Sequence, residues 1–227
     1  YMTLKLYMHP LSSFCHKVLV ALYENGTSFE SVIVDFSNSD SRAAFFEKSP
    51  MGKMPVLQDM ESNVILPESS IIIEYINTHY PGHCGLLPQD ADEQLQVRLW
   101  DRFFDLYIHQ PMQRIVGERL RPEGSLDPHG VSEAHATIDK AYGVLEQHLA
   151  GRQWVASTTF SMADCAAVPA LFYGSIVHPF NDDLRNTSDY FERLVSRLSV
   201  KRVIDEARPY FQYFPYREKM PPRFLQG

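Results

Sequence analysis

The sequence has little cysteine, no excess of positive charge and no long apolar run. Only three cysteines occur among 227 residues, and Cys15, Cys84 and Cys165 lie far apart, which is not a disulfide framework. We therefore expect a reducing compartment, the cytoplasm. No run of about 18 apolar residues exists, so we expect neither a membrane-spanning helix nor a membrane partner. Lys and Arg number 21 against 28 Asp and Glu, and a formal net charge of −7 argues against nucleic acid as a partner.

Two further kinds of signal are missing. The nine histidines do not cluster with cysteine at ligand spacings, so we expect no metal site. The first residues alternate like a strand and do not place a charged start before an apolar run, so we expect no signal peptide. The sequence does contain 44% apolar and 22% charged residues, values typical of a globular protein with a packed core.

The first third of the chain alternates strand-like and helix-like segments. Apolar residues alternate at Leu4, Leu6 and Met8, which predicts a strand. From Cys15 the apolar spacing changes to three and four, which predicts a helix ending at Asn25-Gly26. Further segments are predicted as strands over 31–36, 54–59 and 63–68 and as helices within 37–49 and 69–80. The predicted order is β-α-β-α-β-β-α.

A change of composition divides the chain in two. Segment 81–91 is rich in Pro, Gly and polar residues, which is typical of a linker. The apolar spacing beyond it is helical, as in the series Leu95, Leu99, Phe103 and Leu106 and in segments 138–149 and 190–207. The tail "FPYREKMPPRFLQG" is interrupted by prolines and is expected to lie extended on the surface. We therefore predict an α/β domain over 1–80, a linker over 81–91 and an all-helical domain over 92–227.

The stretch "HPLSSFCHKV" places two hydroxyls and a thiol at the start of the first helix. Ser12 or Ser13 could simply cap that helix, as serine commonly does. Alternatively, the free N–H groups and positive dipole end of the helix could lower the pKa of a thiol placed there. The thiol could be Cys15 or that of a bound substrate. Both interpretations place a hydroxyl at the first turn.

Two later segments could hold a peptide-like ligand. An ordinary Met54-Pro55 bond would be trans, because only about 5–6% of X–Pro bonds are cis. A cis bond would turn the backbone of Met54 outward, where it could pair with an extended peptide. In "PESSIIIEYI", Glu68 and Ser69 stand at the start of a helix, either as helix-end residues or as a grip for a ligand. An acid beside an anion site suits a ligand that carries both charges, as an amino acid does.

The segment "TTFSMADCAAVPALF" indicates structure more than chemistry. Ser161 and Asp164 match the S/T-x-x-D pattern of a capping box, so we predict a helix start here. Pro169 is expected to kink or end that helix.

Taken in this order, the motifs resemble those of a cytosolic glutathione S-transferase. The matching pieces are "HPLSSFCHKV", "GKMPVL", "PESSIIIEYI" and "FSMADCAAV". The resemblance covers essentially the whole chain and implies a thioredoxin-like first domain followed by an all-helical second domain. It also implies glutathione as co-substrate, no metal, a homodimer and a role in detoxification.

The resemblance further implies one glutathione site in the first domain. Ser12 matches the hydroxyl that touches the glutathione sulfur in serine-type members. Lys53 and the Met54 backbone match the residues that hold the glycyl end and the cysteinyl main chain, and Pro55 matches a cis-proline. Glu68 and Ser69 match the pair that grips the γ-glutamyl group.

Other positions match less directly. Ser161 and Asp164 match the folding box of the family. Cys15 stands three residues after Ser12, where many members have no thiol, so a redox or thiol-contact role of Cys15, with Ser13 beside it, stays open. Tyr7 could support a tyrosine-type mechanism, but Ser12 has the better register. Met54 stands where valine is usual.

The second substrate would be a small hydrophobic electrophile between the domains. Its wall is expected in "LYIHQPMQRIVGERL", with Tyr107, Met112 and Arg114 as candidates, although these could equally be core or surface residues. Two other functions remain open. One is glutathione-dependent isomerisation or thiol transfer with disulfide reduction, and the other is non-catalytic binding or regulation on the same scaffold.

Overall fold

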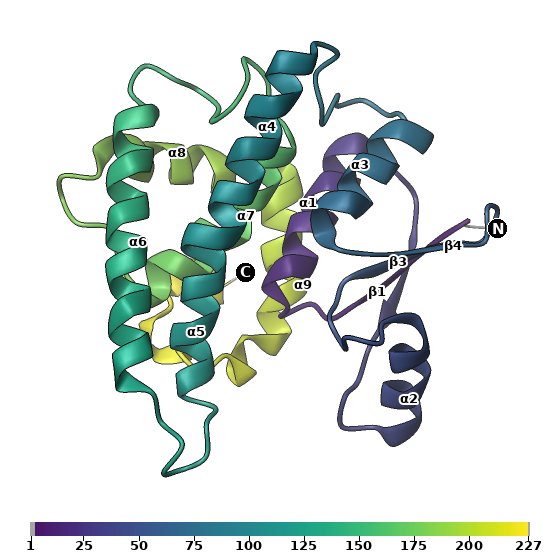
Figure 1. The fold of residues 1–227 in the computed structure, drawn as a ribbon, viewed down its shortest axis with the longest axis horizontal. Helices are drawn as coiled ribbons and strands as arrows, with labels where there is room; N and C mark the ends of the chain where they lie inside the picture. The colour runs from purple at the N-terminus through teal and green to yellow at the C-terminus, as the bar shows by residue number, and fades with distance from the viewer. Residues whose placement is uncertain (1–2, 227) are drawn as a thin grey trace.

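The computed structural model describes residues 3–226, and its first part is a four-stranded sheet with three helices (Figure 1). The elements follow in the predicted order: β1 Leu4–Met8, α1 Ser13–Asn25, β2 Glu30–Ile33, α2 Ser39–Lys48, β3 Val56–Asp59, β4 Val64–Pro67 and α3 Ser69–His79. The strand order in the sheet is β2-β1-β3-β4, with β1 and β2 parallel and β3 antiparallel to both its neighbours. This is the thioredoxin-like arrangement that the resemblance implies.

Helix α1 has the buried face and the glycine end that the sequence predicts. Its apolar residues Val18, Ala21 and Leu22 are fully buried, as their spacing predicts. The helix ends at Gly26, where a φ of 71° lets the Gly26 backbone N–H reach the carbonyls of Leu22 and Tyr23. A left-handed residue at a helix end favours glycine, because glycine has no Cβ to clash.

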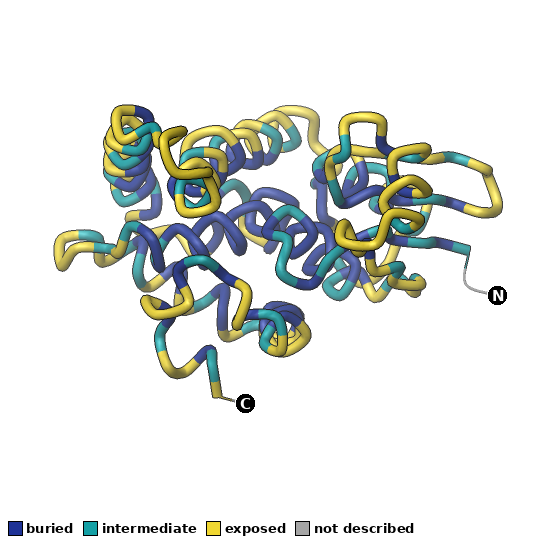
Figure 2. The backbone as a smooth tube through the Cα atoms, turned by 90° about the horizontal axis from the view of Figure 1, so that it is seen from below, coloured by how far each residue is buried: buried dark blue, intermediate teal, exposed yellow. Residues whose placement is uncertain are grey.

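The second part is helical throughout. It comprises α4 Ala91–Phe104, the π-helical turn η1 Asp105–His109, α5 Gln110–Glu118, α6 Pro128–His148, α7 Met162–Val177, α8 Arg185–Ser196, α9 Leu198–Ala207, the 3₁₀ turns η2 Arg208–Tyr213 and η3 Arg217–Lys219, and α10 Pro222–Leu225. Helix α7 lies at the centre, packed between α4 and α1, and nearly all its residues are buried. Buried residues run through the middle of the molecule in Figure 2, and exposed ones mark its outer turns.

Two helix boundaries differ from the prediction. Segment 190–207 is two helices, because Arg197 adopts an extended backbone (φ −67°, ψ 142°) between α8 and α9. Pro169 lies inside α7, which continues to Val177, so the prediction that it could end the helix is wrong. A proline removes one helical hydrogen bond, and here the burial of α7 against α1 and α4 outweighs that loss.

The apolar residues that predicted helix α4 lie mostly on its exposed face and not on the face that packs into the core. The helix is confirmed, but Leu95 and Leu99 are 60% and 57% exposed. The buried face is made by Val97, Trp100 and Phe104. Spacing alone could not separate these faces, because both carry apolar residues at helical intervals.

The tail is not extended. It contains the short helical turns η3 and α10, and the side chains of Phe214, Tyr216, Met220 and Phe224 are buried. The Phe224 ring packs edge-on against Phe172 of α7, with 5.0 Å between ring centroids. Aromatic side chains bury a large apolar area, which offsets the prolines that interrupt the segment.

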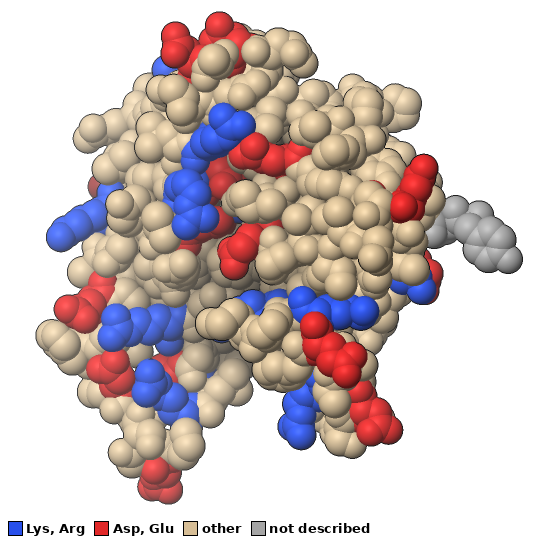
Figure 3. All heavy atoms as spheres, turned by 45° about the vertical axis from the view of Figure 1, so that its right-hand side comes forward, with Lys and Arg blue, Asp and Glu red and all other residues tan. Residues whose placement is uncertain are grey.

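Charges are mixed on the molecular surface. Basic and acidic side chains are interspersed on the face drawn in Figure 3. Within residues 3–226 no helix is both long enough and apolar enough to cross a membrane. The same residues contain no group of three or more His, Cys, Asp or Glu arranged to hold a metal ion.

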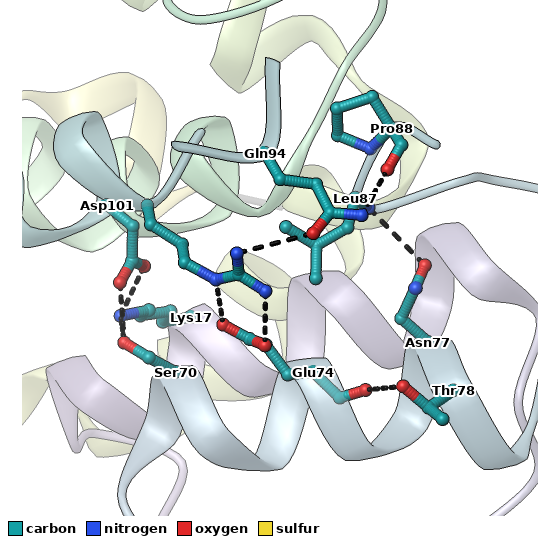
Figure 4. Close-up of polar contacts among 10 residues, drawn as sticks. Lys17, Ser70, Glu74, Asn77, Thr78, Leu87, Pro88, Gln94 and Asp101 are labelled. Carbon is teal, nitrogen blue, oxygen red and sulfur yellow. Dashed lines mark hydrogen bonds and ion pairs between the residues drawn. The ribbon is translucent and has the colours of Figure 1, made fainter. Parts of the chain in front are cut away.

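A buried ion cluster ties the two parts together (Figure 4). The Lys17 ammonium on α1 lies 2.8 Å from Asp101 on α4, 2.8 Å from Asp105 on η1 and 2.9 Å from the Ser70 hydroxyl on α3. Lys17 has no solvent exposure. Because each charge is buried with an opposite partner, the cluster fixes the starts of α1 and α3 relative to the helical part.

Candidate functional site

The predicted ligand-binding residues converge on one cavity of about 520 Å³. They come from three separate segments: the start of α1, the loop before β3 and the start of α3. The predicted residues that line this cavity are Ser12, Lys53, Met54, Pro55, Glu68 and Ser69. The fold of the sheet brings these segments together, because β1, which leads into α1, pairs with β3.

Ser12 stands at the N-terminal end of α1 but does not cap it with its side chain. Its backbone is extended (φ −69°, ψ 120°), and its hydroxyl makes no capping hydrogen bond to the helix. The simple capping interpretation of Ser12 is therefore wrong. The hydroxyl stays available to a ligand at the positive end of the helix dipole.

The neighbours of Ser12 have other roles. Ser13 is 9% exposed, and its hydroxyl lies 2.7 Å from Nε2 of the buried His109 and accepts from Gln113 at 3.3 Å. Cys15 has no exposure, and burial raises its pKa to about 11, while hydrogen bonds involving Ser12 and the His9 backbone oppose that rise. A buried thiol that stays protonated is a poor nucleophile. The structure therefore gives no support to a redox or thiol-contact role for Cys15, and it commits Ser13 to the contact between the domains.

The loop before β3 presents Lys53 and Met54 to the cavity. The Met54–Pro55 peptide bond is cis, as the resemblance implies. The Ser49 hydroxyl accepts from the Lys53 N–H at 3.2 Å and donates to the Lys53 carbonyl at 2.9 Å. Gly52 precedes them with a φ of 63°, and a Cβ there would lie 2.7 Å from the Phe46 ring. The loop is thus held in one shape, with the Lys53 ammonium exposed at the cavity.

The start of α3 supplies the opposite end of the cavity. Ser69 is the first helical residue and is 7% exposed, beside backbone N–H groups that lack helical partners. Glu68 has a φ of 72°, a conformation that costs a residue other than glycine of the order of 1–3 kcal/mol. Such strain persists where the surroundings hold it, and it is common at ligand sites. The helix start offers donors to a carboxylate, and Glu68 offers an acceptor to an ammonium.

Several further residues that the sequence did not single out also line this cavity: Phe14, Phe36, Arg102, Asp105, Gln110 and Gln113. Asp105 is 3% exposed, and burial raises its pKa although Lys17 pulls it down. Its Oδ1 atom is buried without a hydrogen-bond partner within residues 3–226. The π-helical turn turns Asp105 and His109 inward, and no sequence pattern predicts such a turn. A lysine within the apolar face of α1 was the one available signal, because a buried lysine requires acidic partners.

Of the three candidates for the wall of the electrophile pocket, one lines a cavity that contains Ser12. Met112 is buried and lines a second cavity of about 430 Å³ that also contains Ser12. Tyr107, on η1, is 50% exposed and packs beside Phe103, and it lines none of the three cavities that contain Ser12. Arg114 pairs with Asp127 at 3.0 Å and lines none of these cavities either.

Ser12 is shared by three adjacent cavities. Besides the cavity of about 520 Å³, it lines the one of about 430 Å³ toward α5 and the tail, and one of about 620 Å³ toward β2 and η2. Tyr213 at the end of η2 and Phe214 at the start of the tail line the cavity toward α5, and Tyr210 lines the cavity toward β2. A group bound at the Ser12 hydroxyl would therefore face one largely apolar space, toward β2 and η2, and one of mixed polarity, toward α5.

The predicted capping box has a structural role. The Ser161 N–H donates to Asp164 at 2.9 Å, and the Tyr190 hydroxyl and the Val155 N–H donate to the same carboxylate at 2.6 and 3.2 Å. Ser161 is 1% exposed and Asp164 is fully buried. The capping-box geometry is confirmed.

Comparison with known proteins agrees with this geometry. The glutathione S-transferase N-terminal domain model matches residues 6–83, and the glutathione S-transferase C-terminal domain model matches residues 126–197. Glutathione S-transferase F7 of Arabidopsis thaliana is 25% identical over 208 residues, covering 88% of this chain and 99% of the relative.

Solved structures show the same fold. A glutathione S-transferase from Methylobacillus flagellatus KT with GSH bound has a TM-score of 0.79 at 26% identity, over 88% of this chain and 98% of that one. The beta-etherase LigF from Sphingobium sp. strain SYK-6 has a TM-score of 0.78 at 21% identity, over 90% and 100%. With both domain models matched in order on this fold, the chain belongs to the glutathione S-transferase superfamily.

Proposed function

We propose that the protein is a glutathione transferase that activates the glutathione thiolate for attack on a small hydrophobic electrophile. The observation that carries the proposal is that the Ser12 hydroxyl makes no capping hydrogen bond to its own helix. Ser12 lines the cavity shared with Lys53, Glu68 and Ser69, a largely apolar cavity toward β2 and a cavity of mixed polarity toward α5. A peptide held in the first cavity would place its thiol where the other two open.

The proposed grip on glutathione follows from charge and geometry. The Lys53 ammonium suits the glycyl carboxylate, and the Met54 backbone suits the cysteinyl main chain. At the other end, the start of α3 with the Ser69 hydroxyl suits the γ-glutamyl carboxylate. Glu68 suits the ammonium beside that carboxylate. Each charged group of the tripeptide then meets an opposite charge or a helix end.

The proposed activation is electrostatic. A free thiol has a pKa of about 8.5, so at neutral pH only a few per cent is present as the nucleophilic thiolate. A hydrogen bond donated by Ser12 to the anion contributes roughly 1.5–3 kcal/mol, or about one to two pKa units. The positive end of α1 acts in the same direction. The two effects bring the pKa of the sulfur close to neutral pH.

The other functions have less support. Thiol transfer or disulfide reduction would need a reactive protein thiol, and Cys15 is buried and protonated. Isomerisation uses the same bound thiolate and is distinguished only by its substrate. A non-catalytic binding protein would have no need of the free Ser12 hydroxyl. Aryl ethers belong in the substrate panel, because the structurally similar LigF is a beta-etherase.

The proposal extends to a homodimer in the cytoplasm with a role in detoxification. Exposed apolar side chains on α4 and η1 include Leu95, Leu99 and Tyr107, and Ile71 on α3 is 51% exposed. Apolar patches of this kind often mark protein interfaces. All three cysteines are unpaired, in keeping with a reducing compartment. A light-scattering mass in solution would check the dimer.

The experiment that tests the proposed function is the change Ser12→Ala. We expect turnover of a chloronitrobenzene electrophile to fall about 10- to 100-fold, the equivalent of the lost charged hydrogen bond. Retention on a glutathione column should stay near wild type, because the remaining grip is intact. Ser39→Ala, on the exposed start of α2, is the matched control. Undiminished turnover in Ser12→Ala would remove Ser12 from the mechanism.

A further inference from the structure

The cavity between β2 and η2 is lined mostly by apolar surface, and the His9 imidazole is one of its few polar groups. Its volume is about 620 Å³. The lining residues are His9, Leu11, Ser12, Ile33, Val34, Asp35, Phe36, Ser37, Met54 and Tyr210. Asp35 and Ser37 are exposed and hydrogen-bond each other at 2.6 Å. His9 is half-buried and stands three residues before Ser12.

The contacts of His9 define which nitrogen carries the proton. Its Nδ1 accepts the Leu11 backbone N–H at 3.1 Å, so in the neutral ring the proton is on Nε2. The Tyr210 ring meets the imidazole edge-to-face, with centroids 5.0 Å apart and an interplanar angle of 76°. Burial lowers the pKa of His9, and Asp35 raises it by less. The ring is therefore neutral at pH 7.

The Nε2–H group is an available donor. No hydrogen-bond partner for it occurs within residues 3–226, in contrast to the Nδ1 atom. The Ser12 N–H donates to the His9 carbonyl at 3.0 Å, so the two residues are fixed relative to each other. Both line the same cavity. A molecule in this cavity could contact the sulfur held at Ser12 with one atom and the His9 ring with another.

We propose that His9 is a catalytic residue whose Nε2–H donates a hydrogen bond to an electrophile oxygen on which negative charge develops. This rests on the proposed function, and it limits the role of His9 to electrophiles that develop negative charge on oxygen, such as an unsaturated ketone or an epoxide. A neutral imidazole can polarise a carbonyl in this way without giving up its proton. A donor already in place at the developing charge stabilises the transition state more than the ground state.

The step balances without any further reagent. With an unsaturated ketone, the sulfur lone pair forms the S–C bond at the β-carbon, and the π electrons move to the carbonyl oxygen as an enolate. With an epoxide, the sulfur lone pair forms the S–C bond at a ring carbon, while the C–O bond at that carbon breaks and its electron pair stays on oxygen. His9 keeps its proton in both cases, and water protonates the product.

The test compares two electrophile types in one set of variants. Wild type, His9→Asn and His9→Gln are assayed with a phenyl-substituted enone and with a benzyl halide, whose halide leaves without a proton. Asn can place an acceptor where Nδ1 stood but offers no donor at the Nε2 position. Gln can place an N–H there. His129→Asn, on the exposed start of α6, is the matched control.

The measured quantity is the ratio of kcat/KM for the enone to kcat/KM for the halide. We expect this ratio to fall at least ten-fold in His9→Asn, to recover in part in His9→Gln and to stay at the wild-type value in His129→Asn. A ratio that does not change in His9→Asn overturns the inference. So does a ratio that falls equally in Tyr210→Phe, because the donor would then be the tyrosine hydroxyl. If wild type conjugates neither substrate and does not bind glutathione, the proposed function itself fails.

Discussion

Two serines begin two helices of this protein, and their side chains have opposite roles. Ser161 at the start of α7 is 1% exposed and belongs to a complete capping box. Ser12 at the start of α1 is half-buried, makes no cap with its side chain and lines three cavities. The sequences that follow explain the difference. The acid Asp164 stands three residues after Ser161, whereas Cys15 stands three residues after Ser12 and is buried.

This comparison teaches that a helix start can serve either the fold or a ligand. A carboxylate in the third helical position satisfies the backbone N–H of the capping residue and closes the helix end. Without that carboxylate, the α1 end keeps its positive potential and its free hydroxyl for a bound anion. The account therefore predicts that changes at α7 affect stability, whereas changes at α1 affect chemistry.

The largest stability effect is expected for Asp164→Ala. It would leave the Tyr190 hydroxyl, the Val155 N–H and the Ser161 N–H without their buried acceptor. Loss of a buried charged acceptor costs about 3 kcal/mol or more in free energy of unfolding. Urea unfolding measures the loss, and Asp189→Ala on the exposed face of α8 should stay within about 0.5 kcal/mol of wild type. An Asp164→Ala protein that unfolds at the wild-type urea concentration would contradict the structural role.

The next effect is a dependence of folding stability on pH, to which His16 on α1 contributes. His16 is fully buried, burial lowers its pKa to about 4, and its Nε2 lies 2.6 Å from the Pro10 carbonyl, which opposes that shift. An unfolded histidine has a pKa of about 6.5, so below that pH the unfolded chain binds the extra proton and folding stability falls. The contribution of His16 alone to this loss should be roughly 1.5 kcal/mol between pH 6.5 and pH 5.

Urea unfolding at the two pH values measures this slope. His16→Gln should reduce the slope but not abolish it, because the buried His109, whose pKa is also lowered by burial, still titrates. His129→Asn should leave the slope unchanged. A slope that is unchanged in His16→Gln would assign the acid sensitivity to another group.

Much of the fold could be predicted from the sequence, because its signals are local. The alternation at Leu4–Met8, the glycine that ends α1 and the Ser161–Asp164 box each act within a few residues. The outward face of α4, the buried tail and the break at Arg197 depend on contacts between distant segments, and the sequence did not reveal them.

The candidate site divides in the same way. The predicted residues of the cavity of about 520 Å³ lie in three short motifs, each of which can be recognised in the sequence. The two cavities beside Ser12 are walled by β2, α5 and the tail, so no single motif encodes them. Whether Ser12 caps its helix depends on one side-chain rotation, which spacing does not determine.

The most direct measurement is the pH titration of the glutathione thiolate bound to the protein, followed by its ultraviolet absorbance. The account predicts that in wild type the sulfur titrates about one to two pKa units below the free thiol, and that in Ser12→Ala its pKa returns most of the way to about 8.5. A bound sulfur that titrates identically in the two proteins, or that ionises no more readily than free glutathione, would contradict it.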